Sequence, residues 1–517
     1  MSSFQTECCA LSATLAGCYR KAIRWLQALY GRRKGAVDQH FHSEAGVDTG
    51  GHSTPSYLSP KRAPPVRFID LFAGLGGFRQ ALERLGHECV FASEIDSELQ
   101  KVYALNFPDG PAIHGDIRLS KGLVPPHDVL CAGFPCQPFS KSGTQAGLKD
   151  KTSGTLFHEI LEVLRAQKPT YVILENVGNF ERHDEGRTWQ IVKASLQELG
   201  YDVKGTEHVA SGGQGLLSPH HLDSPHHRER FFAVASLLGL PQEVFPQVNR
   251  KARTSIATIV QDQEELSERD RKETRLVDQH YRCIEHWNAF LQALPEERFN
   301  LPSFPIWGDE IDATYCYEDT TPWAQALAST FDSLHSNNGK AAVWDSFKAL
   351  PSYARKEVDA FPEWKIRFIR SNRDWLTSIR NALPIDWIGE LRSFPPSLRK
   401  LEWNCQGEER NLWKHILQFR PSGLRAKRYT NSPSLVAMTS TQIPILGPER
   451  RHLSRVEGLR LQGFPPDFRV PDSRTATFKA LGNAVHVEVV HEIAKRLLPT
   501  EGIEANETRN LAGVGAS

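Results

Sequence analysis

The sequence lacks a hydrophobic run long enough to cross a membrane, and it lacks a strong excess of charge of either sign. Among its 517 residues, 62 Lys and Arg nearly balance 61 Asp and Glu, for a formal net charge of +1. A membrane-spanning helix needs about 20 consecutive apolar residues, and no stretch approaches that length. We therefore expect a soluble protein of two or three domains. Any surface that binds nucleic acid must be a local patch.

Paired cysteine spacing is also absent. The nine cysteines, an odd number scattered from Cys8 to Cys405, include no Cys-x-x-Cys pair. This excludes a disulfide framework and indicates a reducing compartment. The histidines between His220 and His227 have no acidic or thiol partner at a suitable spacing, so we expect no metal site.

One cysteine stands in an unusual setting. Cys136 lies between Pro135 and Pro138, and the apolar run 128–133 before it is typical of a buried parallel strand. The prolines restrain the loop, so Cys136 is presented at the carboxyl end of a strand, where open α/β sheets bind ligands. A reactive thiolate needs nearby positive charge to lower its pKa. The alternative is a buried, inert cysteine.

A strand, a glycine turn and a helix are predicted near the start of this region. The strand covers Val66–Phe72, the turn contains Gly74 and Gly76, and a second strand ends at Glu94. Glycines at such a turn let a ligand approach the helix amino terminus, and the acid can accept hydrogen bonds from a ribose. Because Arg79 replaces the third glycine of G-x-G-x-x-G, the pattern disfavours a nicotinamide cofactor and favours another adenosine-containing ligand.

Further polar groups follow predicted strands. Asp116 follows the third strand region and is available for an adenine amino group, although a plain turn residue is the alternative. Glu175 ends the β-branched strand Tyr171–Leu174, where a structural glutamate is also common. Arg228 and Arg230 are predicted on one side of an incipient strand, where two guanidiniums can bind a phosphate, a carboxylate or a base carbonyl.

Taken together, these motifs make the chain resemble the S-adenosylmethionine-dependent DNA cytosine-5 methyltransferases of bacterial restriction–modification systems. The resemblance covers about Val66 to Ser236 and Arg451 to Leu498. It implies an α/β fold, with a Rossmann-like, mostly parallel sheet, helices on both faces, and a large inserted mixed target-recognition domain. The residues that carry it are Asp70 to Gly77, Gly133 to Ser140, Glu175 to Val177, Arg228 to Arg230, Arg460 to Pro465 and Ala480 to Val485.

The resemblance implies a chemistry. The Cys136 thiolate would add to carbon 6 of a cytosine flipped out of the duplex, so that carbon 5 can take the methyl group and leave S-adenosylhomocysteine. Glu175 would bind N3 and the amino group of the ring, while Arg228 and Arg230 would contact the pyrimidine carbonyl and a phosphate. The family usually has Gln where this chain has His226, which puts the local hydrogen bonding in question.

The resemblance also implies binding residues. Cofactor contacts are expected from Phe72, Ala73, Gly74, Gly76, Glu94, Asp116, Ile117, Pro135, Asn483 and Val485. DNA contacts are expected from Gln137 and Ser140 in the cysteine loop, and from Arg420, Arg425, Lys427 and Arg428. The last four lie in the segment 419–429, which is basic without a single acid, and whose alternative role is a solvated turn.

Five segments are expected along the chain. Nine of the eleven tryptophans lie between Trp287 and Trp413, which indicates that the insert has a core of its own or a large aromatic interface. Within the insert, 264–294 has a charged, helical pattern. The segments are an amino-terminal extension (1–65), a catalytic and cofactor-binding domain (66–236), a target-recognition insert (237–449), the carboxyl-terminal part of the catalytic domain (450–498) and a tail (499–517).

We expect a monomer that acts on double-stranded DNA in the bacterial cytoplasm, with a cognate restriction endonuclease as its functional partner and no metal. Two alternatives use the same fold: a tRNA cytosine-5 methyltransferase and a catalytically silent DNA-binding relative. The large aromatic insert disfavours the first, and the presence of both Cys136 and Glu175 disfavours the second. A nicotinamide oxidoreductase is disfavoured by the glycine spacing.

Overall fold

A seven-stranded sheet organises the first half of the chain. The computed structural model describes residues 65–135, 155–209, 213–249, 253–332, 337–436 and 442–499, so the expected extension 1–65 and tail 499–517 lie almost wholly outside the described residues. The strands of the sheet are β1 (Arg67–Leu71), β2 (Glu88–Ser93), β3 (Ile113–His114), β4 (Val129–Gly133), β5 (Tyr171–Val177), β6 (Asp202–Gly205) and β8 (Arg230–Ser236). A further short strand, β7 (His226–His227), lies outside this sheet.

The strand order of the sheet is β3-β2-β1-β4-β5-β8-β6. All neighbours are parallel except β8, which is antiparallel to both β5 and β6. The chain winds outward from β1 in one direction to β3 and then in the other from β4. Such a reversal leaves a crevice at the carboxyl ends of the central strands, which is where open α/β sheets bind ligands. The predicted Rossmann-like, mostly parallel sheet is confirmed.

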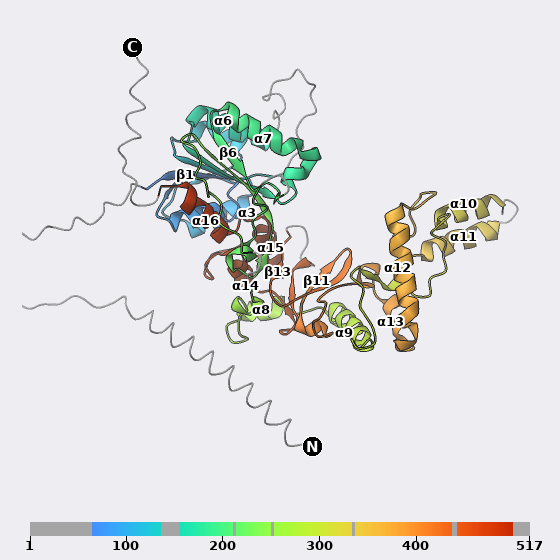
Figure 1. Cartoon of the computed structure of the whole chain (residues 1–517). Coiled ribbons are helices and arrows are strands. Elements are labelled where there is room, and N and C mark those ends of the chain that lie inside the picture. The colour runs from blue at the N-terminus through green and yellow to red at the C-terminus, as the bar shows by residue number, and fades with distance from the viewer. Residues whose placement is uncertain are drawn as a thin grey trace, which may run out of the picture. The chain divides into compact units, whose positions relative to one another are not determined.

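Helices cover both faces of the sheet because its strands are apolar on both faces. Phe68 of β1 packs in one core cluster with residues of α2 and α16, while Ile69 packs in another with Phe157 of α6 and Trp189 of α7. Figure 1 shows α6 and α7 on one side of the sheet and α16 on the other. The helices are α2 (Gly77–Glu83), α3 (Ser97–Asn106), α4 (Ile117–Ser120), α6 (Leu156–Gln167), α7 (Arg187–Glu198), α14 (Arg455–Gln462), α15 (Arg474–Asn483) and α16 (Val487–Leu497).

The carboxyl-terminal helices return to the first strand. Helix α16 packs against α2 through buried aliphatic side chains, and Arg84 donates to Glu488 at 3.1 Å across the two helices. A Cβ atom at Gly77 would lie 2.6 Å from Cγ2 of Val485, so glycine is required there for the close approach of the two segments. Segments 404 positions apart thus cover one face of the sheet together.

The insert has a second sheet and its own core. The sheet order is β15-β14-β11-β12-β10-β9, in which β10 and β12 are parallel and the other neighbours are antiparallel. Buried tryptophans Trp287, Trp387, Trp403 and Trp413 belong to this core. The strands are β9 (Ile306–Trp307), β10 (Lys400–Asn404), β11 (Ile416–Arg420), β12 (Gly423–Lys427), β13 (Ser432–Pro433), β14 (Ile445–Leu446) and β15 (Arg451–His452).

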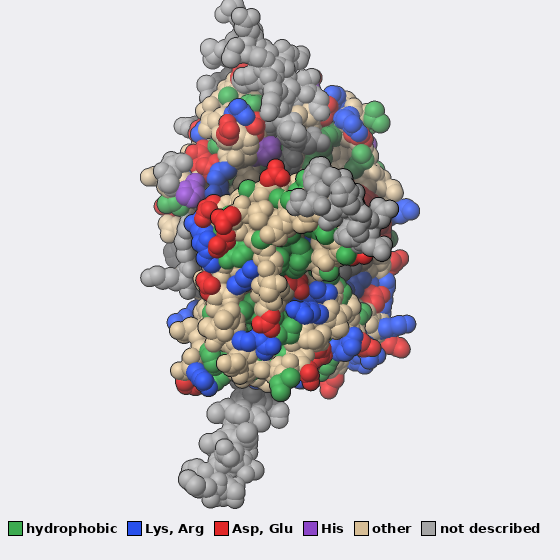
Figure 2. All heavy atoms as spheres, turned by 90° about the vertical axis from the view of Figure 1, so that its right-hand side faces the viewer, with side chains coloured by type: hydrophobic (Ala, Val, Ile, Leu, Met, Phe, Trp, Pro, Cys, Tyr) green, Lys and Arg blue, Asp and Glu red, His purple; other side chains and the backbone are tan. Residues whose placement is uncertain are grey.

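Helices complete the insert. The sequence pattern indicates one helical stretch over 264–294, but the structure divides it. The charged pattern over 264–294 forms two helices, because Arg275 leaves the helical path to bridge Arg451. Figure 2 shows acidic and basic side chains intermixed on one face of the molecule, with no uniformly basic area. The helices are α8 (Glu268–Glu273), α9 (Asp278–Gln292), α10 (Pro322–Asp332), α11 (Asn337–Ala349), α12 (Glu363–Ile379) and α13 (Trp387–Ser393). No helix among the described residues is long and apolar enough to span a membrane.

Candidate functional site

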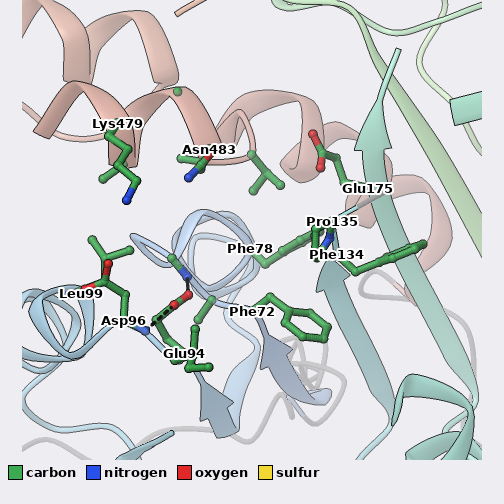
Figure 3. Close-up of a pocket in the computed structure, with 18 of the residues that line it drawn as sticks. Phe72, Phe78, Glu94, Asp96, Leu99, Phe134, Pro135, Glu175, Lys479 and Asn483 are labelled. Atoms are coloured by element: carbon green, nitrogen blue, oxygen red, sulfur yellow. Dashed lines mark hydrogen bonds between the residues drawn. The ribbon is translucent and has the colours of Figure 1, made fainter. Parts of the chain in front are cut away.

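A cavity of about 480 Å³ opens at the carboxyl ends of β1, β4 and β5. Its wall includes Phe72 after β1, Pro135 after β4 and Glu175 at the end of β5, together with Asn483 and Val485 from the carboxyl-terminal segment. Figure 3 shows Asn483 and Lys479 on one side of this cavity, with Glu94 and Asp96 across from them. The sheet reversal therefore brings together residues from both ends of the chain.

The turn after β1 has the left-handed backbone that glycine favours. Phe72, Gly74 and Gly76 have φ angles of 57°, 56° and 83°. Phe72, Ala73 and Gly74 line the cavity. Gly76 caps α2 and faces the core instead, since a Cβ atom there would lie 2.7 Å from Phe107. Phe72 adopts a conformation that is costly for a large side chain, as is common where a backbone is held for a ligand.

Glu94 ties the ends of β1 and β2 together. Its Oε2 atom accepts a hydrogen bond from the Gly74 amide at 2.8 Å, and its Oε1 atom accepts one from the Asp96 amide at 2.9 Å. Each carboxylate oxygen can accept a further bond. Glu94 therefore fixes the glycine turn and still has acceptor capacity for a ligand hydroxyl.

A second cavity, of about 350 Å³, shares Phe72 and Glu94 with the first. Asp116 and Ile117 line it. The Asp116 side chain caps α4 by accepting from the Arg118 amide at 2.9 Å, and it also accepts from the Arg118 guanidinium. The predicted adenine and ribose contacts thus lie around one cavity, and the remaining predicted cofactor contacts, except Gly76, around the other.

Glu175 and Arg230 form a nearly buried ion pair in the first cavity. The Nε atom of Arg230 lies 3.0 Å from Oε1 of Glu175, and the Glu175 side chain is 9% exposed. Burial raises the pKa of the Glu175 carboxyl, and the positive charges of Arg230 and Arg228 oppose this shift. Glu175 therefore holds its proton to a higher pH than a free glutamate, which suits a group that shares a proton with a ring nitrogen.

Arg228 is buried more deeply than a contact with a pyrimidine carbonyl or a phosphate requires. Its residue is 1% exposed, and its Nη2 atom donates to the carbonyl of Ala484 at 2.8 Å. Burial, reinforced by the charge of Arg230, lowers the pKa of this guanidinium. In this structure Arg228 binds the backbone beside Asn483 and Val485, so it braces the cavity wall.

His226, which departs from the family pattern, joins three parts of the chain. Its Nδ1 atom donates to the carbonyl of Leu461 at 2.9 Å, and its Nε2 atom accepts from the amide of Leu435 at 3.4 Å. Burial lowers its pKa well below the usual value, so the ring is neutral. Its strand β7 also pairs with β13, at Ser432. A neutral imidazole thus both donates and accepts a hydrogen bond at this position, as a glutamine side chain also can.

Phe134 and Pro135, which directly precede the predicted nucleophile in the sequence, line this cavity. Asn176 donates from Nδ2 to the carbonyl of Phe134 at 2.9 Å, which fixes the backbone beside Pro135. Three predicted residues follow at once and lie outside the described residues: Cys136, Gln137 and Ser140. The role of Asn176 was missed in the sequence, although it adjoins Glu175 and must point to the opposite face of β5.

Lys479 is a second residue that the sequence analysis missed. It lies on α15, four residues before Asn483, and both line the cavity. Residues four apart share one face of a helix, so the spacing could have indicated it. Lys479 adds a positive charge across the cavity from the carboxylates of Glu94 and Asp96.

The basic segment of the insert is paired with acids that are distant in sequence. Arg425 donates from Nε to Glu402 at 2.5 Å, and Arg420 lies 3.8 Å from the same carboxylate. Arg428 pairs with Glu408 at 3.0 Å. Lys427 is mostly buried, and burial lowers its pKa. The four predicted DNA contacts thus do not form a free basic patch.

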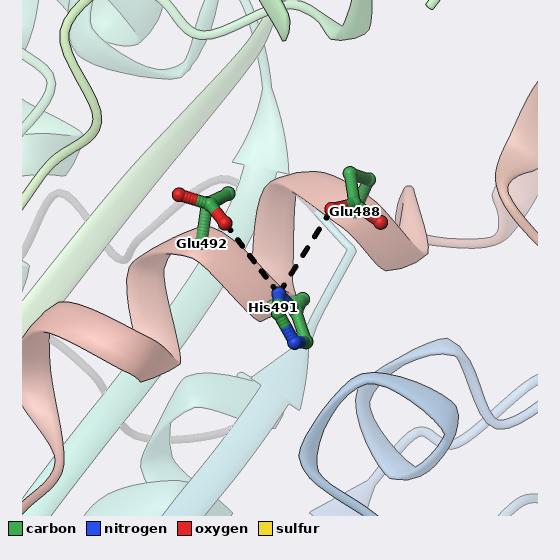
Figure 4. Close-up of side chains that lie close together, drawn as sticks. All are labelled: Glu488, His491 and Glu492. Atoms are coloured by element: carbon green, nitrogen blue, oxygen red, sulfur yellow. Dashed lines mark ion pairs between the residues drawn. The ribbon is translucent and has the colours of Figure 1, made fainter. Parts of the chain in front are cut away.

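One group of side chains among the described residues has the spacing of metal ligands. Glu488, His491 and Glu492 lie on α16 with their ligand atoms within 4.8 Å of one another. Figure 4 shows His491 between the two glutamates. The carboxylates also pair with Arg84 and Arg496, whose charges compete with a cation.

Comparisons with known proteins identify the family of the chain. The chain is 33% identical to the type II methyltransferase M.AluI of Cellulosimicrobium cellulans over 83% of this chain and 91% of that protein. It is 28% identical to M.BanI of Aneurinibacillus aneurinilyticus over 87% and 99%, and 50% identical to M.HhaI of Haemophilus parahaemolyticus over 28% and 43%. The profile of the C-5 cytosine-specific DNA methylases matches residues 66–498. The chain therefore belongs to the C-5 cytosine-specific DNA methylase family.

Proposed function

We propose that this protein transfers a methyl group from S-adenosylmethionine to carbon 5 of a flipped-out cytosine in a specific double-stranded DNA sequence. The observation that carries the proposal is the convergence of Glu175 and Arg230 with the start of the Cys136 loop on one cavity. That cavity joins a second one suited to a nucleoside. The family match supports the same reaction.

The two cavities fit a cofactor that is both an amino acid and an adenosine. Glu94 has spare acceptor capacity for the ribose hydroxyls, and Asp116 for the adenine amino group. Phe72, Ala73, Gly74, Ile117, Pro135, Asn483 and Val485 would complete the contacts. When bound, the cofactor supplies an electrophilic methyl group. We propose no resident metal.

The protein's own side chains activate the cytosine ring and stabilise its charge. Carbon 5 of cytosine is a poor nucleophile until Cys136 adds as a thiolate to carbon 6, which places electron density on the ring. Glu175 holds a proton at N3, and the Arg230 guanidinium stabilises the carbonyl oxygen where negative charge builds. After carbon 5 has taken the methyl group, a base removes the proton from carbon 5, and the thiolate leaves carbon 6. Arg228 binds the carbonyl of Ala484 and Asn176 binds the carbonyl of Phe134, so the two side chains hold opposite parts of the cavity wall in place.

The reaction can be tested with tritiated cofactor and two nucleic acids. We expect label in duplex DNA and none in tRNA; label in tRNA alone would overturn the proposal in favour of a tRNA methyltransferase. Duplex containing 5-fluorocytosine should trap the protein covalently, because carbon 5 then has no removable proton. If no covalent complex forms with the wild type, the protein is a silent DNA-binding relative.

We further propose that the protein acts as a monomer and protects its host's DNA from a cognate restriction endonuclease. Bisulfite sequencing of DNA from cells expressing the chain reports the modified sequence. That DNA should resist cleavage by a nuclease of the same specificity. Light scattering of the protein bound to one duplex should give the mass of one chain plus that of the duplex.

The proposed function also assigns a role to each segment of the chain. We propose that 66–236 and 450–498 together form the catalytic domain, and that 237–449 is the target-recognition insert. The second core supports this division, because all of its buried residues lie within 237–449. The core beside α16 also takes in Ile416 and Leu446 from the insert, so the two parts pack against each other. Removal of 1–65 should then leave methyl transfer intact.

A further inference from the structure

The central hairpin of the insert has one apolar and one polar face. In β12, Arg425 pairs with Gln418 of β11 and with Glu402 of β10. Directly paired residues lie on the same face of a sheet, and alternate residues along a strand share that face. Leu424 and Ala426 therefore point to the opposite face, where they are buried in the core of the insert. The core of the insert therefore packs on the apolar face, and Arg425 lies on the other face of the sheet.

Glu402 gathers the polar side chains of this face. Its Oε2 atom accepts from Nε of Arg425 at 2.5 Å, and its Oε1 atom accepts from the Ser422 hydroxyl at 2.7 Å. Nη1 of Arg420 lies 3.8 Å from Oε2. The Glu402 side chain is 10% exposed, whereas those of Arg425 and Arg420 are 28% and 32% exposed. One nearly buried carboxylate thus anchors two guanidiniums that still reach the surface, with a net charge of +1.

The anchored guanidinium of Arg425 keeps its outer edge available. Hydrogen bonds among the described residues engage Arg425 only through Nε. Its two Nη groups form a planar fork, which matches the O6 and N7 acceptors of guanine in the major groove. A guanidinium already fixed by a carboxylate loses less side-chain entropy when it binds.

The same strand leads toward the catalytic cavity. Lys427, two residues after Arg425, approaches His220 and His227 closely enough for its charge to help lower their pKa values. His227 lies in β7, and Arg230 of the cavity follows three residues later. The polar face of the hairpin is therefore linked through Lys427 to the segment that supplies Arg230.

We propose that Glu402 positions the guanidinium of Arg425, assisted by Arg420, to recognise a guanine edge in the target duplex. This inference rests on the proposed function, because it assigns sequence recognition to that enzyme. Arg425 contacts the base, and Glu402 is a positioning residue that acts through it.

The test uses the recognition sequence found by bisulfite sequencing. Each guanine of that sequence is replaced in turn by 7-deazaguanine, which lacks the N7 acceptor. We expect one position at which the wild type loses about 10- to 100-fold in kcat/KM. Arg425→Ala should lose a similar factor on unmodified DNA and lose nothing further from 7-deazaguanine at that position.

Glu402→Gln tests positioning. It should raise KM for DNA and weaken discrimination at the same guanine, with little change in the single-turnover rate constant. Glu402→Asp should restore part of the discrimination. Arg370→Ala breaks the exposed pair of Arg370 with Glu318, which lies outside the sheet, and should match the wild type.

Two outcomes separate this inference from the proposed function. Absence of methyl transfer by the wild type to any duplex would contradict the proposed function. Normal transfer with equal sensitivity of the wild type and Arg425→Ala to every 7-deazaguanine would overturn only the guanine assignment. If a variant fails to fold, the wild-type series remains decisive, because insensitivity at every guanine position also overturns it.

Discussion

Arg230 holds its Nε atom 3.0 Å from Oε1 of Glu175, and the two residues lie diagonally on one face of the antiparallel pair β5 and β8. The pairing lowers the cost of burying the carboxylate, but burial still leaves the pKa of Glu175 raised. The arrangement keeps a nearly buried carboxyl group at the cavity, where it can share a proton with a base and remain oriented by a fixed charge.

Replacement of Glu175 tests that role. Glu175→Gln keeps the shape of the side chain but removes the acid, so we expect a fall in single-turnover rate of about 10²- to 10⁴-fold with little change in cofactor affinity. Glu162→Gln, which breaks a surface pair with Arg165 on α6, is the matched control and should retain the wild-type rate. Equal rates for the wild type and Glu175→Gln would remove Glu175 from the reaction.

Replacement of Cys136 tests the nucleophile. Without the thiol, carbon 6 has no covalent partner, so we expect Cys136→Ala to lose methyl transfer by at least about 10³-fold and to form no complex with 5-fluorocytosine duplex. Cofactor binding, measured by calorimetry, should persist. A trapped complex of Cys136→Ala would show that another residue attacks the ring.

The sequence predicted the parts of this site that depend on local pattern. Apolar strands that end in Glu94 and Glu175, and a turn that contains Gly74, can each be recognised within a few residues. The parallel order of those strands then brings their carboxyl ends to one edge. What could not be predicted depends on pairs that are distant in the chain.

Arg425 shows this limit most clearly. Its segment contains no acid, yet Glu402, 23 residues earlier, reaches it because β10 and β12 pair in parallel. Likewise, the contact of Arg228 with the carbonyl of Ala484 spans 256 positions. A sequence pattern identifies such residues as charged, but only the fold determines which charges meet.

His226 can be exchanged for the residue that the family uses. Glutamine can also donate to the carbonyl of Leu461 and accept from the amide of Leu435, so we expect His226→Gln to keep activity within about 3-fold and to change stability little. His226→Leu leaves both backbone groups buried without a partner. It should lower the free energy of unfolding by about 2–4 kcal/mol, measured by urea denaturation. A His226→Leu protein as stable as the wild type would show that water replaces the imidazole.

The reaction should not require a divalent cation. The proposed nucleophile, acid and positive charges are all side chains, and the glutamates beside His491 are paired with Arg84 and Arg496. We therefore expect methyl transfer in EDTA to stay within about 2-fold of that in buffer alone, and His491→Ala to behave like the wild type. Loss of activity in EDTA that is restored by a single metal, with His491→Ala inactive, would assign a metal to α16.

Buried neutral histidines should make the fold sensitive to mild acid. Burial lowers the pKa of His452 to about 3 and that of His486 to about 3, and it lowers the pKa of His226 well below its usual value. Below pH ~6.5 the unfolded chain takes up protons at these rings and the folded chain does not, so stability falls as the pH falls. Asp70 acts in the opposite direction, because burial raises its pKa.

A single variant isolates one of these rings. His452 donates to the carbonyl of Ile443 at 3.0 Å, which a glutamine can also do. Between pH 6 and pH 5, the free energy of unfolding of His452→Gln should fall less steeply than that of the wild type, by about 1.4 kcal/mol per pH unit. If His452→Gln and the wild type have parallel curves, His452 gains its proton in the folded protein as readily as in the unfolded chain, and burial does not hold it neutral.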